Sequence, residues 1–215
     1  MEKETGFTLV EIAIVLVIIG LILAAVLKGQ EMITQGKIKG IINDFNAVLT
    51  AYNGYQDRYK AIPGDDPNSG ARWTTLGVSG NGNGTVDGEY NDATGGTSEA
   101  TYFWADLKFA NFFPGLTDTA AHAEAQPSNS VGGIIGVQNN ALGMSGLSIC
   151  MSAVVYKIAQ SVDTQIDDGN AMTGSVRATV QTAGATLAQL PDLTGGAPAA
   201  NYVDGSTYVI CRSIP

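Results

Sequence analysis

The sequence predicts an α+β protein: a long N-terminal α-helical spine packed on a C-terminal globular head that contains a small antiparallel β-sheet. Three observations support this class. Residues 7–27 are almost uniformly apolar, residues 28–62 continue with amphipathic spacing, and short strand-like segments lie near the end of the chain. We therefore divide the sequence into a short leader (1–6), an apolar helix, an amphipathic helix and a head (63–215).

The apolar run has the length of a membrane-spanning helix. Its 21 residues, from Phe7 to Leu27, are interrupted only by Thr8, Glu11 and Gly20, and about 20 apolar residues cross the hydrocarbon core of a bilayer. A cleaved secretory signal is the alternative, but such signals have a basic leader and a shorter apolar core. A membrane-spanning helix is therefore favoured.

Glu11 is the position in this run that needs a reason, because a carboxylate inside a bilayer is costly. It could reach back to the lipid headgroups and do nothing else. Alternatively, it could pair with a positive group inside an apolar assembly. An α-amine freed by cleavage after Gly6 would be such a group on a neighbouring helix.

Beyond Lys28 the apolar residues recur every three or four positions, which predicts an amphipathic helix to about Tyr59. The pair Pro63-Gly64 ends it. A coiled coil is the alternative, but heptads with flanking charges are not sustained. We expect one stripe of this helix, from Met32 onward, to pack on the head.

The head combines loops with a few regular elements. Residues 63–100 are predicted to be loop-like, with Asp65 and Asp66 as turn caps after Pro63 in preference to calcium ligands. A helix is expected from Glu99, and 131–146 is expected to be a short strand or an interface loop.

The last third of the chain contains one further helix and two strands. Apolar residues after Cys150 have helical spacing and predict a helix that ends at a turn over 167–170; they are Val154, Val155, Ile158, Val162 and Ile166. Residues 176–180 and 208–211 alternate and predict strands.

Two cysteines, Cys150 and Cys211, lie far apart, and neither belongs to a metal-binding motif. If the chain is exported, a disulfide between them is the natural interpretation. Closing a loop of about 60 residues would stabilise the fold by roughly 4 kcal/mol. The alternative is two unpaired buried thiols.

The segment SGNGNGTVD, residues 79–87, resembles an EF-hand-type calcium loop, because oxygen-bearing side chains alternate along a glycine-rich turn. The twelfth position is Tyr90 instead of a bidentate glutamate. Glu89, Asp92 or Glu99 could replace it, and we prefer Glu99. The predicted calcium ligands are Ser79, Asn81, Asn83, Thr85 through its carbonyl, Asp87 and Glu99. A solvated Gly/Asn turn is the alternative.

Composition and motifs disfavour nucleic-acid binding and catalysis. The net charge of −9 is unsuited to phosphate backbones. The single histidine, His122, has no convincing nucleophile or metal partner near it in the sequence, and the GNGNG loop lacks the lysine of a phosphate-binding loop. We therefore expect no catalytic residues.

The stretch from Gly6 to Glu11, GFTLVE, followed by the apolar run, resembles the processing motif of type IV pilins and pseudopilins. In that family a membrane peptidase cuts after the glycine and methylates the new N-terminus. The resemblance implies removal of leader 1–6, cleavage between Gly6 and Phe7, and N-methylation of Phe7. It also implies that Glu11 pairs with a neighbour's N-terminus during assembly.

The same resemblance implies partners and locations. The partners are copies of the chain in a helical filament, prepilin peptidase, and a pilus or secretion assembly machinery. The chain would be a single-pass inner-membrane protein before assembly, and afterwards part of a cell-surface filament or a periplasmic pseudopilus. The head would be exported, although Lys28, Lys37 and Lys39 alone would favour the opposite orientation. Lys28 also stands where these pilins often have a proline.

The head adds weaker similarities to exported pilin-like proteins. These are PGD before a GNG-type loop with a Glu-led aromatic helix, and the phrase VDTQIDDGNAMTGSVRA. They favour calcium and a disulfide that closes the C-terminal region. The resulting hypothesis is a structural subunit of a type IV pilus-like filament. The alternatives are a minor pilin or type II secretion pseudopilin that binds a substrate or surface, and a plain membrane-anchored calcium-binding protein.

Overall fold

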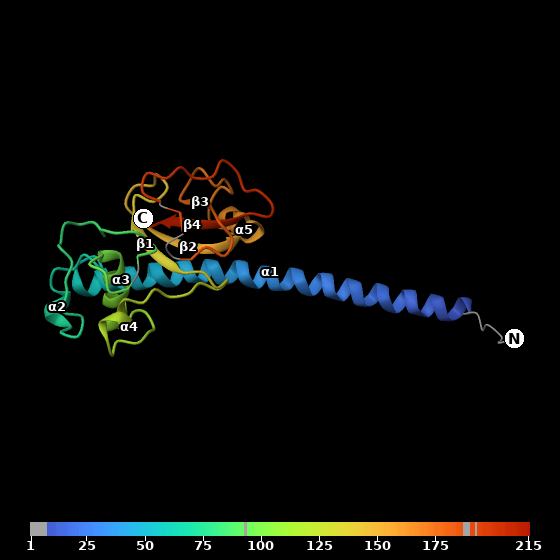
Figure 1. The fold of residues 1–215 in the computed structure, drawn as a ribbon, viewed down its shortest axis with the longest axis horizontal. Helices are drawn as coiled ribbons and strands as arrows, with labels where there is room; N and C mark the ends of the chain where they lie inside the picture. Colours follow the sequence, from blue (N-terminus) through green and yellow to red (C-terminus); the bar gives the residue numbers. More distant parts are fainter. Residues whose placement is uncertain (1–7, 93, 187–189, 192) are drawn as a thin grey trace. The chain divides into compact units, whose positions relative to one another are not determined.

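The structure, a computed structural model, describes residues 8–92, 94–186, 190–191 and 193–215. In chain order the elements are α1 (Leu9–Tyr59), α2 (Ser69–Arg72), α3 (Glu99–Phe109), α4 (Ala120–Glu124), β1 (Ile135–Asn139), β2 (Leu147–Val155), α5 (Tyr156–Ile166), β3 (Val176–Gln181) and β4 (Thr207–Ser213) (Figure 1). The predicted α+β class is confirmed. The chain divides into two compact units, Met1–Lys37 and Ile38–Pro215.

Helix α1 ends for local reasons. The Lys60 N–H donates to the Gln56 carbonyl at 2.9 Å. Lys60 itself has a φ of 55°, the left-handed conformation in which many helices end. Pro63 follows and could not continue the helical hydrogen bonds. The predicted end of the helix is confirmed.

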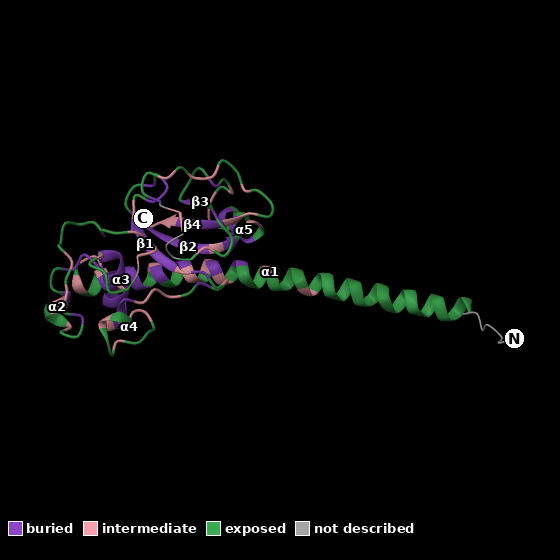
Figure 2. Cartoon of the chain, viewed as in Figure 1, coloured by how far each residue is buried: buried purple, intermediate pink, exposed green. Residues whose placement is uncertain are grey.

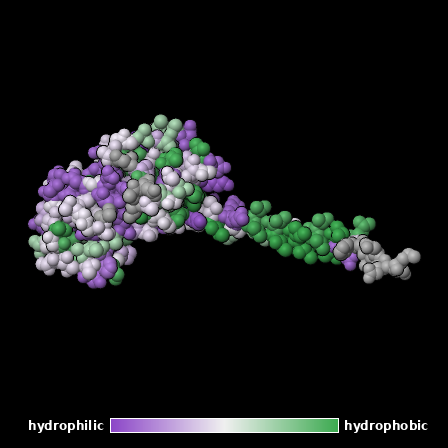
Figure 3. Space-filling view, in the orientation of Figure 1, coloured by the Kyte–Doolittle hydropathy of each residue, from purple (hydrophilic) through white to green (hydrophobic). Residues whose placement is uncertain are grey.

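In the first unit, α1 is exposed and, as far as Leu27, almost uniformly apolar. Among the described residues, it is the helix long and apolar enough to cross a membrane, and none of its most apolar window is buried in the protein. Figure 2 draws this part as almost wholly exposed, and Figure 3 shows most of its length as hydrophobic. Soluble monomers rarely expose an apolar area of this extent. Lipid or other helices must therefore cover it.

In the second unit, one stripe of α1 forms the base of the head core. Its buried residues are Ile38, Ile41, Phe45, Val48, Ala51, Tyr52 and Tyr55, and they cluster with side chains from α3, α5 and the sheet. The prediction that the packed stripe begins at Met32 is wrong. Met32 and its neighbour Ile33 are 67% and 62% exposed. The first buried residue of the helix is Ile38.

The four strands form an antiparallel sheet in the order β1-β2-β4-β3. Side chains alternate between its two faces. One face, with Met151 and Ile210, joins the core built on α1. The other face, with Val209 and both cysteines, joins a second cluster formed with Tyr90 and loop residues. The sheet is therefore covered on both faces.

The helix predicted from Cys150 onward begins later than expected. Cys150, Val154 and Val155 belong to β2, and α5 begins only at Tyr156. In a run this apolar, helical spacing and strand alternation are hard to separate from sequence alone. Pairing with β4, which places Val154 opposite Tyr208, decides in favour of the strand. The predicted strands at 176–180 and 208–211 are confirmed, and 131–146 contains β1.

Cys150 and Cys211 lie directly opposite each other on β2 and β4, with Cα atoms 4.0 Å apart, and form a disulfide. The predicted pairing is confirmed. Both residues are fully buried, in the cluster that contains Tyr90 and Leu142. The bond therefore joins two neighbouring strands inside a packed cluster.

We expect the double variant Cys150→Ser/Cys211→Ser to lose roughly 4 kcal/mol of unfolding free energy, because the disulfide limits the freedom of the unfolded chain. The bond closes a loop with a sequence separation of 61. Urea unfolding of the full chain in detergent measures the difference. A variant as stable as the wild type would show that strand packing alone holds this edge of the head.

Candidate functional site

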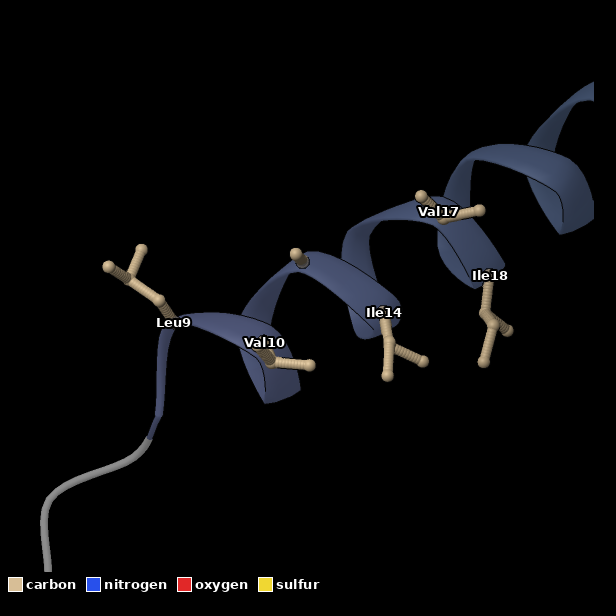
Figure 4. Close-up of a pocket in the computed structure, with 6 residues that line it drawn as sticks. Leu9, Val10, Ile14, Val17 and Ile18 are labelled. Atoms are coloured by element: carbon tan, nitrogen blue, oxygen red, sulfur yellow. The ribbon is translucent and has the colours of Figure 1, made fainter.

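The start of α1 presents apolar side chains from successive turns. Leu9, Val10, Ile14, Val17 and Ile18 line a shallow groove along the helix (Figure 4). Its remaining lining residue, Ala13, is also apolar and leaves room between the larger side chains. Such a surface can receive lipid chains or the side chains of another helix.

Glu11 and Thr8 form a reciprocal cap at the start of α1. The Thr8 N–H and hydroxyl each donate to Glu11 Oε2 at 2.8 Å. In return, the Glu11 N–H donates to Thr8 Oγ1 at 3.3 Å. This is the capping-box arrangement, in which two helix-terminal N–H groups are satisfied by two side chains. Glu11 is therefore held by local contacts in the single subunit.

Thr8 is a site residue that our sequence analysis missed. The spacing Thr-x-x-Glu before an apolar run is the signature of a capping box and could have revealed it. Gly6 and Phe7, the predicted cleavage and methylation positions, lie outside the described residues. Cleavage between them stays a prediction.

The backbone of the glycine-rich loop of the head is hydrogen-bonded to the carboxylate of Asp65. This carboxylate is 4% exposed. Its Oδ1 accepts from the N–H groups of Gly82 at 2.6 Å and Asn83 at 3.0 Å. Its Oδ2 accepts from the Gly84 N–H at 2.7 Å. Successive backbone N–H groups thus form a concave anion-binding nest. Asp65 is a loop anchor, whereas we predicted a turn cap; Asp66 does cap the turn, accepting from the Asn68 N–H at 2.8 Å.

Glu99 is the second anchor of the same loop. It lies in the first turn of α3 and is 5% exposed. Its Oε1 accepts from the Asn81 N–H at 2.8 Å, and its Oε2 accepts from the Asp87 N–H at 3.0 Å. Glu99 therefore holds the loop backbone at Asn81 and Asp87. Asp65 holds the backbone between them, from Gly82 to Gly84.

The structure gathers three of the six predicted calcium ligands, Asn81, Asn83 and Asp87, together with the hydroxyl of Thr85, a residue that was predicted to bind through its carbonyl. Asn81 Nδ2 and Asn83 Nδ2 lie 3.2 and 3.4 Å from Asp87 Oδ2. Thr85 Oγ1 lies 2.7 Å from Asn83 Oδ1 and 3.5 Å from Asp87 Oδ1. These four side chains are exposed and turned toward one another.

Two further predicted ligands, Ser79 and Glu99, face different partners. Ser79 Oγ accepts from the Gly70 N–H at 2.9 Å, and Glu99 contacts the loop backbone as described above. The gathered group therefore has oxygen atoms suited to a hard cation but only one carboxylate, from Asp87. Calcium affinity rises with the number of charged ligands, so this group fits a weakly held ion.

A charged network lies behind the loop. Asp66 Oδ2 accepts from the Tyr55 hydroxyl and from Arg72 Nη1, each at 2.8 Å. The Arg72 guanidinium also lies over the rings of Tyr59 and Trp73, at 4.2 and 4.9 Å from their centroids. Burial raises the pKa of Asp66, but the hydrogen bonds from Arg72 and the other donors outweigh burial and lower it overall.

Asp106, on α3, is the acid of this network whose charged form is disfavoured overall by burial. It is fully buried, and its Oδ2 accepts from the Gly64 N–H at 2.7 Å. Burial, with a smaller contribution from Asp66, raises the pKa of Asp106 to about 7; the Gly64 N–H, Ser69 and Arg72 oppose that rise. The carboxyl group is therefore half protonated near neutral pH.

A second acidic group lies at the C-terminal end of α5, with Asp163 in the helix and two acids just after it. Carboxylate oxygens of Asp163, Asp167 and Asp168 lie within 4.8 Å of one another. Asp163 accepts from Tyr202, Asp167 from the Ser175 N–H, and Asp168 from the Thr173 hydroxyl. Burial raises the pKa of Asp163. These hydrogen bonds order the predicted turn at 167–170.

His122 is exposed, with Nδ1 2.6 Å from Asp118 Oδ1.

Comparison with known proteins assigns the N-terminal segment. The prokaryotic N-terminal methylation motif matches residues 1–27, which include the whole apolar run. This match supports a type IV pilin-like or pseudopilin assignment. No curated protein and no solved structure matches the chain. The pilin-like assignment therefore depends on the N-terminal motif and the apolar helix, and the role of the head has to be inferred from its own residues.

The raised pKa of Asp106 predicts that the head loses stability as the pH rises. The folded-state pKa of about 7 exceeds the ordinary value of 3.8, so the folded state binds the proton more tightly than the unfolded state does. Below about pH 4 both states are protonated, and this destabilisation is absent. It grows as the pH rises through the interval up to about 7 and reaches about 4 kcal/mol at most.

Asp106→Asn should remove this pH dependence while still accepting from Gly64. We expect the difference in melting temperature between wild type and variant to change steadily between pH 4 and pH 7.5. Asp57→Asn is the control, because Asp57 is exposed and bonded to Lys60. A constant difference across this interval would contradict the raised pKa.

Proposed function

We propose that this pilin-like protein is a structural, non-enzymatic subunit of an extracellular type IV pilus-like filament. The apolar part of α1 would first anchor the subunit in the inner membrane and then pack against other subunits in the filament core. The observation that carries the proposal is one acid, Glu11, at the start of an exposed apolar helix within a methylation motif. In a plain membrane anchor this acid would serve only to cap the first turn of α1.

The position of Glu11 suits pairing between subunits. Cleavage after Gly6 would leave the α-amine of Phe7 four residues upstream, on the same end of the helix. When apolar helices of two subunits lie side by side, the amine of one can reach the carboxylate of the other. In surroundings that exclude water, a charge pair is stronger, and an unpaired charge is costly. The pairing would therefore select one register between neighbouring helices.

In the unpaired subunit, Thr8 would keep the Glu11 carboxylate satisfied. Its two hydrogen bonds to Oε2 stabilise the first turn of α1. After assembly, the same carboxylate could also accept from a neighbour's amine, because each carboxylate oxygen accepts more than one hydrogen bond. Prepilin peptidase and a pilus or secretion assembly machinery are the other partners that this function requires.

The alternative is a minor pilin or type II secretion pseudopilin that binds a substrate or a surface through its head. It would use the same anchor and the same Glu11 pairing, but at low copy number. Abundance in isolated filaments separates the two: a main component supports the structural subunit, and a trace component supports the alternative.

Replacing Glu11 by valine should block filament assembly while leaving membrane insertion intact, because the variant keeps the apolar helix but loses the charge pair. Filaments are counted by electron microscopy in cells that supply the peptidase and the assembly machinery. Intact mass and N-terminal sequencing report whether Gly6–Phe7 is still cut and Phe7 methylated. Glu31→Gln is the control, since Glu31 is an exposed acid of α1 beyond the apolar run, paired with Lys28. Normal filaments from Glu11→Val would rule out the pairing.

We further propose that the 79–88 loop binds a calcium ion weakly. Asn81, Asn83, Thr85 and Asp87 would hold it, with Glu99 and Asp65 keeping the loop in shape from below. The supporting observation is that these four oxygen-bearing side chains face one another on an exposed loop. A bound ion would also neutralise Asp87.

Calcium should raise the melting temperature of the wild type, because a ligand that binds only the folded state stabilises it. Asp87→Ala should abolish this rise, whereas Asp57→Ala, which changes an exposed acid far from the loop in sequence, should retain it. The measurement is thermal unfolding of the full chain in detergent, in chelator and in increasing calcium. An identical melting temperature in chelator and in millimolar calcium would exclude the site.

A further inference from the structure

The glycine-rich loop contains two of the three Asn-Gly pairs of the sequence, Asn81-Gly82 and Asn83-Gly84; the third is Asn53-Gly54. Asn-Gly pairs are prone to deamidation. The glycine backbone nitrogen loses its proton and attacks the asparagine side-chain carbon, ammonia leaves, and a cyclic imide forms. Water then opens the imide to aspartate or isoaspartate, so the net reaction consumes one water and releases one ammonia. Glycine permits the attack because it has no Cβ to hinder it.

The three pairs lie in different surroundings. Asn53-Gly54 is inside α1, where the backbone is held by helical hydrogen bonds. Asn81 and Asn83 are exposed to solvent in a loop without regular structure. By exposure and backbone class alone, the loop pairs should therefore be the reactive ones.

Asp65 binds the two nitrogen atoms that the reaction needs. The Gly82 N–H donates to Asp65 Oδ1 at 2.6 Å, and the Gly84 N–H donates to Asp65 Oδ2 at 2.7 Å. A nitrogen whose proton is held by a carboxylate is harder to deprotonate, because the anion formed would face a negative charge. The same hydrogen bonds point each nitrogen at Asp65, which is buried beneath the loop.

The asparagine side chains are also held away from the attacking nitrogens. Asn81 Oδ1 accepts from the Asn83 N–H at 2.9 Å, and Asn83 Oδ1 accepts from the Thr85 N–H at 2.8 Å. Each amide is therefore engaged with the residue two positions ahead, not with the adjacent glycine. Both reacting groups of both pairs are occupied in the folded protein.

We propose that Asn81 and Asn83 are deamidation sites whose reaction is suppressed by the buried Asp65 carboxylate. Suppression matters because both side-chain amides donate to Asp87. Deamidation would replace these donors by carboxylates, so that up to three negative charges would meet where there is now one. Opening of the loop around Asp65 would thus start an irreversible change in its charge.

The test follows conversion of each asparagine in the full chain in detergent, by peptide mass spectrometry after incubation at pH 8. Asp65→Asn keeps the side-chain size and removes the charge. Losing a charged acceptor weakens each hydrogen bond, so we expect deamidation at Asn81 and Asn83 to accelerate roughly tenfold or more. Asn53 should be unaffected. Asp92→Asn is the matched control, because Asp92 accepts from the Glu89 N–H in the neighbouring turn.

Equal rates in the wild type and in folded Asp65→Asn would overturn the proposal, as would equal acceleration in Asp92→Asn. If Asp65→Asn does not fold, wild-type protein alone decides the outcome through two measurements. Amide hydrogen exchange at Gly82 and Gly84 should be much slower than in the urea-unfolded chain, and conversion of Asn81 and Asn83 should be slower to a similar degree. Unfolded-like rates for either measurement in the native chain would overturn the proposal.

Discussion

The packing of one stripe of α1 is the constraint on which the head depends. The side chains from Ile38 to Tyr55 are the surface against which the sheet, α3 and α5 bury their apolar residues. Because the stripe repeats every three or four residues, it fixes which face of the helix is covered. The apolar run that precedes this stripe has no separate polar face. Its exposed side chains need a partner of a different kind, lipid or another helix.

Below the glycine-rich loop, the head uses buried carboxylates where other proteins use regular secondary structure. Asp65 and Glu99 accept from five backbone N–H groups of the loop. Charge-assisted hydrogen bonds of this kind are strong, and they offset the free-energy cost of removing the two carboxylates from water. Asp106 is buried nearby with less compensation, which explains its raised pKa. The same hydrogen bonds order the loop and, by our proposal, protect its Asn-Gly pairs.

Some elements could be predicted because their signals are local. Pro63 marks the end of α1, and alternation marks β3 and β4. Val154 and Val155 could not be assigned, since an apolar run satisfies both helical and strand spacing until a partner strand selects one. Met32 and Ile33 continue the helical pattern but lie before the packed stripe, and spacing does not reveal where packing begins. In the loop, the alternation of oxygen-bearing residues correctly indicated that Asn81, Asn83 and Asp87 would come together.

The sequence by itself determined the apolar helix, its acid at Glu11 and the methylation motif, because each depends on residue type and short-range spacing. The two cysteines are 61 residues apart, and the register of β2 and β4 decided between a disulfide and two free thiols. Only the tertiary structure decided the roles of Asp65, Glu99 and Asp106. These acids are separated along the chain from most of the groups they contact: Asp65 binds amides 17 to 19 residues away, and Asp106 binds one 42 residues away. Hydrogen bonds over such separations are set by how α3 and the loops fold onto α1, and no local pattern encodes them.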